Sequence, residues 1–147
     1  MTASPFTIDI QLRWGDMDSL AHVNNVQFAR LLEEARVRAW HVWFSDSGAE
    51  DSPTLPILVA RQEIEFVAPL YYGVEPVRIE MWVPRIGTKS FDYGYRIATH
   101  DGQIAALAET TCTVIDPSSG RPAAIPEGSR AILEDYAGDE VPFRRRR

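Results

Sequence analysis

The stretch WGDMDSLAHVNNVQF occupies residues 14–28 and joins a predicted strand to a predicted helix. Before it, apolar residues alternate with polar ones from Phe6 to Trp14, which is the two-residue period of a strand that buries one face. Within it, Asn24 or Asn25 offers a side chain suited to capping a helix N-terminus. This stretch therefore marks where the first two elements of the fold meet.

The residues that follow have the periodicity of one amphipathic helix. Apolar side chains recur every three or four positions, and polar side chains occupy the opposite face. The apolar positions are Phe28, Leu32, Ala35, Ala39 and Val42, and the polar ones are Gln27, Arg30, Glu34, Arg38 and His41. We therefore expect a single long helix that packs its apolar face against the rest of the chain.

Strand patterns dominate the chain after a turn-rich, acidic loop at residues 45–56. The connections between these strands are short, so successive strands are expected to pair antiparallel as hairpins. The four predicted strands span residues 57–68, 74–83, 90–99 and 103–115, and Pro126 begins a short C-terminal helix through about Asp135. The predicted class is α+β, with a five-stranded antiparallel sheet wrapped around one long central helix.

A length of 147 residues with 45% hydrophobic composition suits one globular domain with its own core. We assign residues 1–137 to that domain. Residues 138–147 end in the run Arg144–Arg147, and like charges in a row resist ordering. This last segment is therefore expected to be a flexible, Arg-rich tail.

A formal net charge of −6 argues against nucleic-acid binding, because such proteins concentrate cationic charge against phosphates. No apolar run approaches the roughly 20 residues that cross a bilayer, so no membrane span is expected. The N-terminus lacks the pattern of a secretory signal, and Cys112 has no partner for an internal disulfide. These features predict a cytoplasmic protein.

Three side chains directly ahead of the helix start, Asp16, Asp18 and His22, are the main candidates for chemistry. The first N–H groups of a helix lack intrahelical acceptors and carry the positive end of the helix dipole. They can polarise a carbonyl oxygen while a neighbouring carboxylate acts as a general base towards water or attacks the carbonyl directly. The residue pattern does not separate these two routes.

The stretch DMDSLAHVNNVQF at residues 16–28 resembles the signature of the 4-hydroxybenzoyl-CoA thioesterase-like family of hotdog-fold proteins. It joins an Asp, a His four residues later, an Asn pair at the helix start and an aromatic residue ten positions after the Asp. Further support comes from IEFVAPLYYG at 64–73, IGTKSF at 86–91 and TVIDPSSGRPAAIP at 113–126. The resemblance covers about Thr7 to Leu133 and implies the hotdog fold.

The resemblance implies that Asp18 is catalytic and that a backbone N–H near Asn25 polarises the thioester carbonyl. His22 then has an orienting or ligand-contacting role, and Asp16 is expected to make a structural hydrogen bond. The plant acyl-carrier-protein thioesterases have a related pattern in which Asp, Asn and His are spaced by two. Here Leu20 stands where that pattern has Asn, which favours a mechanism with one carboxylate.

The resemblance also implies that the hairpin containing Arg85, Lys89 and Ser90 meets the nucleotide end of coenzyme A. The residues alone leave a second interpretation open, in which this is a charged hairpin tip in water. Members of the family characteristically pair as dimers with the active cleft between subunits. We therefore expect a homodimer or a homotetramer as the working unit.

Other chemistries fit the sequence less well. Asp16, Asp18 and His22 are metal-ligand types, but zinc sites usually recruit several His or Cys residues and the calcium-loop pattern fails after the second Asp. No GxSxG nucleophile elbow surrounds a serine, and Cys112 lies in an apolar strand as an inert thiol. We expect no metal and no organic cofactor.

Together with the resemblance, these residues predict hydrolysis of an acyl-coenzyme A thioester to a free carboxylic acid and coenzyme A. Coenzyme A is then part of the substrate. The alternative is a non-catalytic acyl-CoA binder with a sensing or structural role, because a fold does not establish chemistry. A hydratase is a third possibility, but its expected histidine pattern is not apparent. Trp40, Trp43 and Phe44 are candidates for the acyl pocket, with a plain core role as the competing interpretation.

Overall fold

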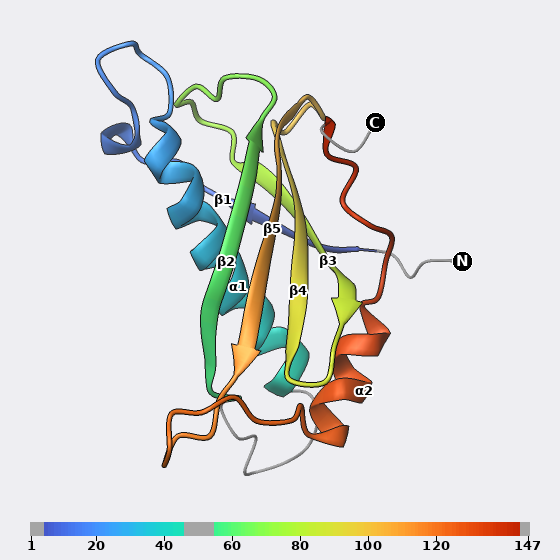
Figure 1. Ribbon diagram of the computed structural model, residues 1–147. Helices are drawn as coiled ribbons and strands as arrows, with labels where there is room; N and C mark the ends of the chain where they lie inside the picture. The colour runs from blue at the N-terminus through green and yellow to red at the C-terminus, as the bar shows by residue number, and fades with distance from the viewer. Residues whose placement is uncertain (1–4, 46–54, 145–147) are drawn as a thin grey trace.

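The structure is a computed structural model that describes residues 5–45 and 55–144 (Figure 1). Its elements follow the predicted order, with a short 3-10 turn, η1 (Trp14–Asp16), added after the first strand. The strands are β1 (Phe6–Ile10), β2 (Ile57–Phe66), β3 (Val77–Ile86), β4 (Ser90–Ala98) and β5 (Ile104–Val114), and the helices are α1 (Asn25–Ser45) and α2 (Glu127–Asp135). The predicted α+β class is confirmed.

All five strands form one antiparallel sheet in the order β1-β3-β4-β5-β2. Successive strands were expected to pair as hairpins, and β3–β4 and β4–β5 do so. The expected pairing of β2 with β3 is wrong, because β2 lies at the far edge of the sheet beside β5. β2 pairs with β5 along its length, from Ile57 opposite Val114 to Phe66 opposite Ala106. β1 and β2 are therefore the sheet edges, and within the described residues no strand covers the outer side of β2.

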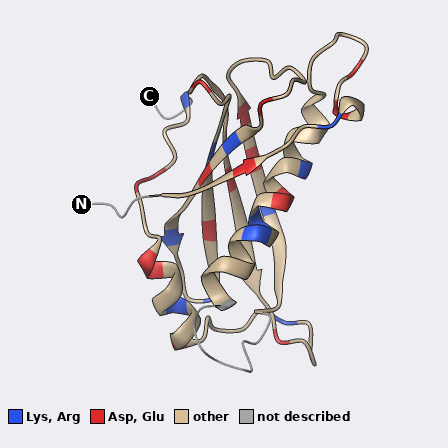
Figure 2. Cartoon of the chain, turned by 180° about the vertical axis from the view of Figure 1, so that it is seen from behind, with Lys and Arg blue, Asp and Glu red and all other residues tan. Residues whose placement is uncertain are grey.

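The long helix α1 lies across one face of the sheet and buries an apolar stripe against it (Figure 1). The stripe is Phe28, Leu31, Leu32, Ala35, Ala39 and Trp43. Figure 2 shows charged residues along the outward side of the same helix. Val42, predicted to belong to the stripe, is instead 44% exposed. The 3.6-residue period turns the stripe towards Trp43 in the last turns, so Val42 falls outside it.

The first strand ends earlier than its alternation of residues predicts. β1 stops at Ile10, and Trp14 lies in the 3-10 turn with 75% of its side chain exposed. The backbone N–H of Arg13 donates to the carboxylate of Asp16 at 2.8 Å and closes this turn. A local side-chain bond to the backbone thus replaces the continuation of the strand.

Residues 138–144, which we expected to be part of a flexible tail, pack on the face of the sheet opposite α1 (Figure 1). Val141 and Phe143 are buried with Trp82 and Leu107 in a second, smaller apolar cluster. The prediction of a tail beginning at residue 138 is therefore wrong as far as Arg144, and residues 145–147 lie outside the described part. Two isolated apolar residues give no periodicity, which is why the sequence did not reveal this contact.

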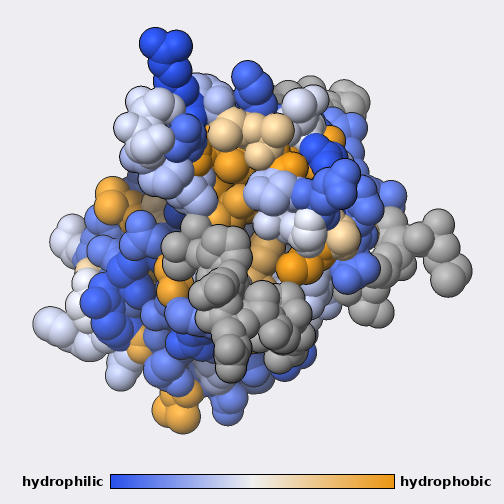
Figure 3. Space-filling model, turned by 90° about the horizontal axis from the view of Figure 1, so that it is seen from below, coloured by the Kyte–Doolittle hydropathy of each residue, from blue (hydrophilic) through white to orange (hydrophobic). Residues whose placement is uncertain are grey.

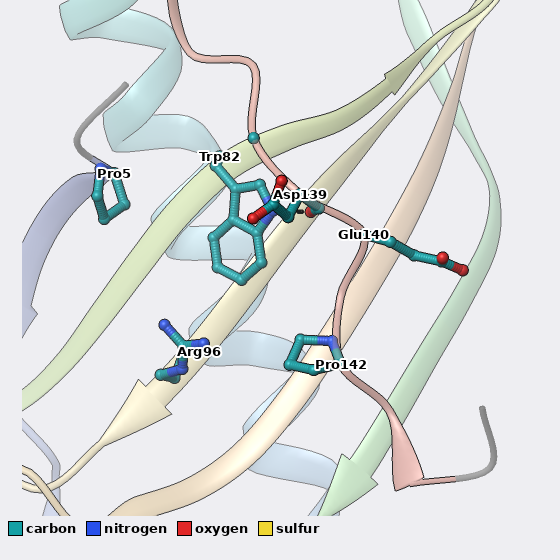
Figure 4. A pocket seen from close by; sticks show the side chains of 7 residues that line it. Pro5, Trp82, Arg96, Asp139, Glu140 and Pro142 are labelled. Atoms are coloured by element: carbon teal, nitrogen blue, oxygen red, sulfur yellow. Dashed lines mark hydrogen bonds between the residues drawn. The ribbon is translucent and has the colours of Figure 1, made fainter. Parts of the chain in front are cut away.

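Trp82 is the residue that this C-terminal segment covers. Its indole N–H donates to the carbonyl oxygen of Asp139 at 2.7 Å, and the guanidinium of Arg96 lies 5.5 Å from its ring centroid (Figure 4). A cavity of about 310 Å³ remains beside the ring, between Pro5 and the segment. Arg96, which lines this cavity, is paired with Glu80 at 2.8 Å.

No helix among the described residues is long and apolar enough to cross a membrane.

The close packing of Trp82 on Gly94 gives a test of this arrangement. A Cβ at Gly94 would lie 2.9 Å from Cε2 of Trp82 and 3.0 Å from Val141, so Gly94→Ala overfills the contact. We expect a loss of about 1–3 kcal/mol in the free energy of unfolding, measured by urea denaturation. Gly128→Ala is the matched control, because a Cβ there meets nothing within 4 Å and alanine favours the helix. Equal stability of the two variants would contradict the packing described.

Candidate active site

The site is built on a buried carboxylate, that of Asp16, whose side chain has no exposed surface. Arg13 donates to its Oδ1 through Nε at 3.0 Å and Nη2 at 2.8 Å, and Arg30 of α1 donates to Oδ2 at 2.7 Å. Burial alone would raise the pKa of Asp16, but the hydrogen bonds from Arg13 and the charges of Arg30 and Arg13 lower it. Asp16 therefore has the structural role that the sequence predicted.

The loop between Asp16 and α1 is a tight turn with Asp18 near its tip. Asp18 N–H donates to the carbonyl of His22 at 3.0 Å, and Ala21 N–H donates back to the carbonyl of Asp18 at 3.0 Å. Ala21 has a φ of 65°, in the left-handed region, so the chain reverses at this point. The carboxylate Oδ1 of Asp18 accepts from Leu20 N–H at 2.9 Å, and no described residue donates to its Oδ2.

The helix start lies beside this turn. Asn24 is the cap, because its Oδ1 accepts from the backbone N–H of Val26 at 2.9 Å, and α1 begins with Asn25. The Asn25 N–H belongs to the first turn, where no preceding turn can supply an acceptor. A second bond, from Asn24 N–H to the carbonyl of Asp16 at 2.9 Å, fixes the helix start relative to the Asp18 turn.

Asp18, His22 and Asn25 line one cleft of about 480 Å³. The sequence had placed these three residues together, and the structure brings them into the same cleft. Apolar side chains form much of the wall. The remaining lining residues are Leu20, Val23, Phe28, Phe66, Val67, Ala68 and Pro69. The cleft thus combines one accessible carboxylate, one helix N-terminus and an apolar wall, which is a suitable surrounding for a carbonyl compound.

His22 lines the cleft but does not form a hydrogen bond with Asp18. Its Nδ1 lies 3.9 Å from Oδ1 of Asp18, which is longer than a hydrogen bond. Its ring meets Tyr71 edge to face, with 6.4 Å between centroids. The side chains of His22 and Asp18 are 35% and 25% exposed, so both are accessible from the cleft. The described geometry therefore supplies no preformed Asp–His pair.

The segment after β2 is the part of the site that we did not predict. Phe66 packs edge to face on Phe28 at 5.1 Å between centroids, and residues 67–69 continue the wall. Val23 N–H donates to the carbonyl of Leu70 at 2.7 Å and ties this segment to the Asp18 turn. In the sequence, only the motif IEFVAPLYYG at residues 64–73 marks this segment, and it indicates the family resemblance without indicating that the segment lines the cleft.

The proposed coenzyme A residues lie at the other end of the sheet. Ser90 pairs with Thr113 beside the beginning of β2, whereas the Asp18 cleft is at its end, about 30 Å away for ten residues of strand. Arg85 is engaged by Asp92, with Nε to Oδ2 at 2.9 Å and Nη2 to Oδ1 at 3.0 Å, and it also donates to Ser90 Oγ. One chain therefore does not bring Arg85, Lys89 or Ser90 to Asp18.

A model of the thioesterase-like superfamily matches residues 12–133 of the sequence. The chain belongs to the thioesterase-like superfamily. The match includes the Asp18 turn, α1 and the whole sheet after β1, so it covers every element that lines the cleft. No curated protein matches the chain.

Solved structures of similar fold cover most of the chain. A predicted thioesterase from Bacillus stearothermophilus has 24% identity and a TM-score of 0.79, covering 92% of this chain and 98% of that one. A thioesterase superfamily structure from Jannaschia sp. CCS1 has 21% identity and a TM-score of 0.81, covering 94% and 99%. A thioesterase from Thermus thermophilus, complexed with coenzyme A and Zn, has 27% identity and a TM-score of 0.74, covering 90% and 94%. The predicted hotdog fold is confirmed.

The described residues of this superfamily member contain no cluster of side chains that could bind a metal ion. Among residues 5–45 and 55–144, no group of three or more His, Cys, Asp or Glu side chains could hold a metal ion. Asp16 is occupied by two arginines, so it does not join Asp18 and His22 as a ligand. The thiol of Cys112 is buried, and burial raises its pKa to about 12. It is therefore an inert core residue, as the sequence predicted.

The buried Asp16 carboxylate gives a pH-dependent prediction. Its pKa is lowered in the folded chain, so its pairing stabilises the fold above the unfolded value of 3.8 and is lost as the pH falls through the lowered pKa. Asp16→Asn should lower the free energy of unfolding by about 1–3 kcal/mol at pH 7. Urea denaturation at several pH values should show this difference shrinking below about pH 4. Asp18→Asn is the control and should leave stability nearly unchanged; a pH-independent difference for Asp16→Asn would be inconsistent with the buried ion pair.

Proposed function

We propose that the chain hydrolyses acyl-coenzyme A thioesters to a free carboxylic acid and coenzyme A, with Asp18 as the reacting carboxylate. The observation that carries this proposal is the cleft in which the open Oδ2 of Asp18 and the N-terminus of α1 lie together. Membership of the thioesterase-like superfamily supports the reaction type, and the coenzyme A complex of the similar Thermus protein supports the ligand. Neither a metal nor an organic cofactor takes part in the proposed reaction.

In the proposed reaction the thioester carbonyl oxygen accepts a hydrogen bond from the Asn25 N–H, where the helix dipole stabilises developing negative charge. Asp18 either removes a proton from the attacking water or attacks the carbonyl carbon itself. The C–S bond then breaks and coenzyme A leaves as a thiolate, whose modest pKa removes the need for a strong acid. In the second route, water hydrolyses the mixed anhydride and restores Asp18. His22 contacts the ligand.

We also propose that the working unit contains two copies of the chain, paired antiparallel through β2. This strand is ten residues long, its outer edge is open in the described chain, and Leu58, Val59 and Phe66 are 56%, 50% and 48% exposed. An edge of that length is a template for pairing, and antiparallel pairing with a second copy is self-complementary. A homodimer would pair the open edge of β2 and cover its exposed apolar side chains. A homotetramer can be built from two such dimers.

Antiparallel pairing would also complete the coenzyme A site. The beginning of one β2 would lie beside the end of the other, so Ile57 of one subunit would neighbour Phe66 of the partner subunit. The β3–β4 hairpin lies at the Ile57 end. The partner's Lys89 and Ser90 would then reach the cleft of Asp18, where an exposed lysine can meet a phosphate. Arg85 would act there mainly by fixing the hairpin through Asp92 and Ser90.

Replacement of the carboxylate tests the proposed reaction. Asp18→Asn preserves the shape of the side chain and its acceptor for Leu20 N–H, but it removes the base or nucleophile. We expect thiol release from acyl-CoA esters to fall by about 100-fold or more, with binding of the ester retained in calorimetry. Asp101→Asn, at an exposed turn, is the control and should keep full turnover.

Two outcomes would contradict the proposed reaction. Unchanged hydrolysis by Asp18→Asn would remove this residue from the mechanism. Binding without turnover for acetyl, medium-chain, long-chain and aromatic esters in the unmodified protein would favour the non-catalytic acyl-CoA binder instead.

A further inference from the structure

The C-terminal segment, residues 138–144, crosses the face of the sheet opposite α1 and runs from α2 towards the end of β2 (Figure 1). At its start, Gly138 N–H donates to the carbonyl of Val83 in β3 at 3.1 Å. At its end, Arg144 N–H donates to Oε2 of Glu65 in β2 at 2.9 Å. Because β4 and β5 separate β3 from β2 in the sheet, the segment passes over both strands between these two bonds.

Buried side chains hold the segment between its two end contacts. Val141 and Phe143 are both buried, and they form the smaller apolar cluster with Trp82 and Leu107. Phe143 directly precedes Arg144, so it is the member of the cluster that lies nearest along the segment to the contact with β2. The backbone bonds and the buried side chains fix the segment against the sheet, so it can support whatever packs on the same cluster.

Val67 joins this cluster to the Asp18 cleft. Its side chain packs against the cluster, and the same residue lines the cleft. Its backbone N–H donates to the carbonyl of Ala105 at 2.8 Å, so pairing with the neighbouring chain continues beyond the end of β2. Glu65, which binds Arg144, lies only two residues earlier. The end of the C-terminal segment therefore supports the cleft wall at the point where β2 ends.

The wall at residues 66–69 is also joined to the start of α1. The ring of Phe66 packs edge to face on Phe28 in the first turn of the helix. Just beyond the wall, the carbonyl of Leu70 accepts from the N–H of Val23 at 2.7 Å. A shift of the wall would therefore change the width of the cleft beside the helix N-terminus, where the ester carbonyl binds in the proposed reaction.

Different contacts hold the reacting carboxylate. The turn of Asp18 follows Asp16, whose buried carboxylate is bound by Arg13 and by Arg30. Arg30 belongs to α1, which lies on the other face of the sheet from the C-terminal segment. A change in this segment should thus move the cleft wall and leave Asp18 in place.

We propose that the C-terminal segment positions the wall of the Asp18 cleft, with Phe143 as the positioning residue. Phe143 fills the cluster on which Val67 packs, and it thereby sets the width of the cleft in which an acyl-CoA ester binds. It acts on substrate binding and not on the chemical step, because the contacts of Asp18 and of the helix start do not involve it. This inference rests on the proposed thioester hydrolysis and adds a residue that governs its Michaelis constant.

The test measures thiol release from benzoyl-CoA and hexanoyl-CoA. Phe143→Ala leaves a gap into which the wall relaxes, so we expect KM to rise about fivefold or more with kcat within about twofold, the pattern of lost uniform binding. Phe143→Leu keeps most of the buried volume and should keep KM within about twofold of the unmodified value. Leu133→Ala is the control, because it also removes a fully buried side chain, but in α2, at the end of the molecule that Figure 3 views. It should leave KM unchanged.

A double-mutant cycle tests whether Phe143 acts through Val67. Val67→Ala alone removes part of the wall and should also raise KM, but in Phe143→Ala the wall is already displaced. The double variant should therefore raise KM by less than the product of the two separate factors. Glu65→Ala removes the acceptor of Arg144 N–H and leaves the cluster intact, so it should raise KM by a smaller factor. This variant tests the segment even where Phe143→Ala does not fold.

Calorimetric binding separates this inference from the proposed function. If no ester is hydrolysed, the proposed function fails, and the dissociation constant of benzoyl-CoA replaces KM in every comparison. Weaker binding in Phe143→Ala that Phe143→Leu does not share then supports the inference. It is overturned by unchanged substrate binding in Phe143→Ala, by an equal weakening in Leu133→Ala, or by independent factors in the double variant. Absence of both hydrolysis and binding in the unmodified protein overturns it as well.

Discussion

The buried carboxylate of Asp16 is the constraint from which the site follows. It binds Arg13 after β1 and Arg30 in α1, so one side chain joins the end of the first strand to the long helix. Its backbone carbonyl accepts from Asn24 at the helix start. The turn that carries Asp18 lies between Asp16 and the helix start, which these contacts hold together. Because the Asp16 carboxylate is buried and bound by both arginines, its contacts fix the position of the Asp18 turn beside the helix N-terminus.

Much of the fold and part of the site could be predicted from the sequence. Phe28 and Ala35 set the phase of α1, and the strand periodicities predicted the sheet, because burial on one face leaves a repeat in the sequence. The Asp18 cleft was predicted in outline from one local motif. The pairing of Arg85 with Asp92 was not, because it joins residues on two strands and leaves no periodic sign. Isolated apolar contacts such as Val141 escape prediction for the same reason.

The groups that the proposed function needs lie at the two ends of one edge strand. The carboxylate of Asp18 and the helix N-terminus lie at the Phe66 end of β2, whereas the Lys89 hairpin lies at the Ile57 end. Neither end alone offers both the proposed reacting carboxylate and the proposed anion-binding hairpin. A two-fold axis beside β2 would bring the two together twice, and the exposed apolar side chains of that strand would then be covered.

Subunit complementation tests this account most directly. Asp18→Asn removes the carboxylate. Val37→Trp, at an exposed position of α1, fills the cleft that Trp40 and Ile57 line, which antiparallel pairing through β2 would place beside the partner's Asp18. Each variant alone should be nearly inactive. Refolded together in equal amounts, random pairing makes half of the dimers mixed, each with one intact composite site, so about a quarter of the unmodified thiol release should return. No recovery, in mixtures whose mass shows mixed dimers, would place the whole site within one chain and contradict the account.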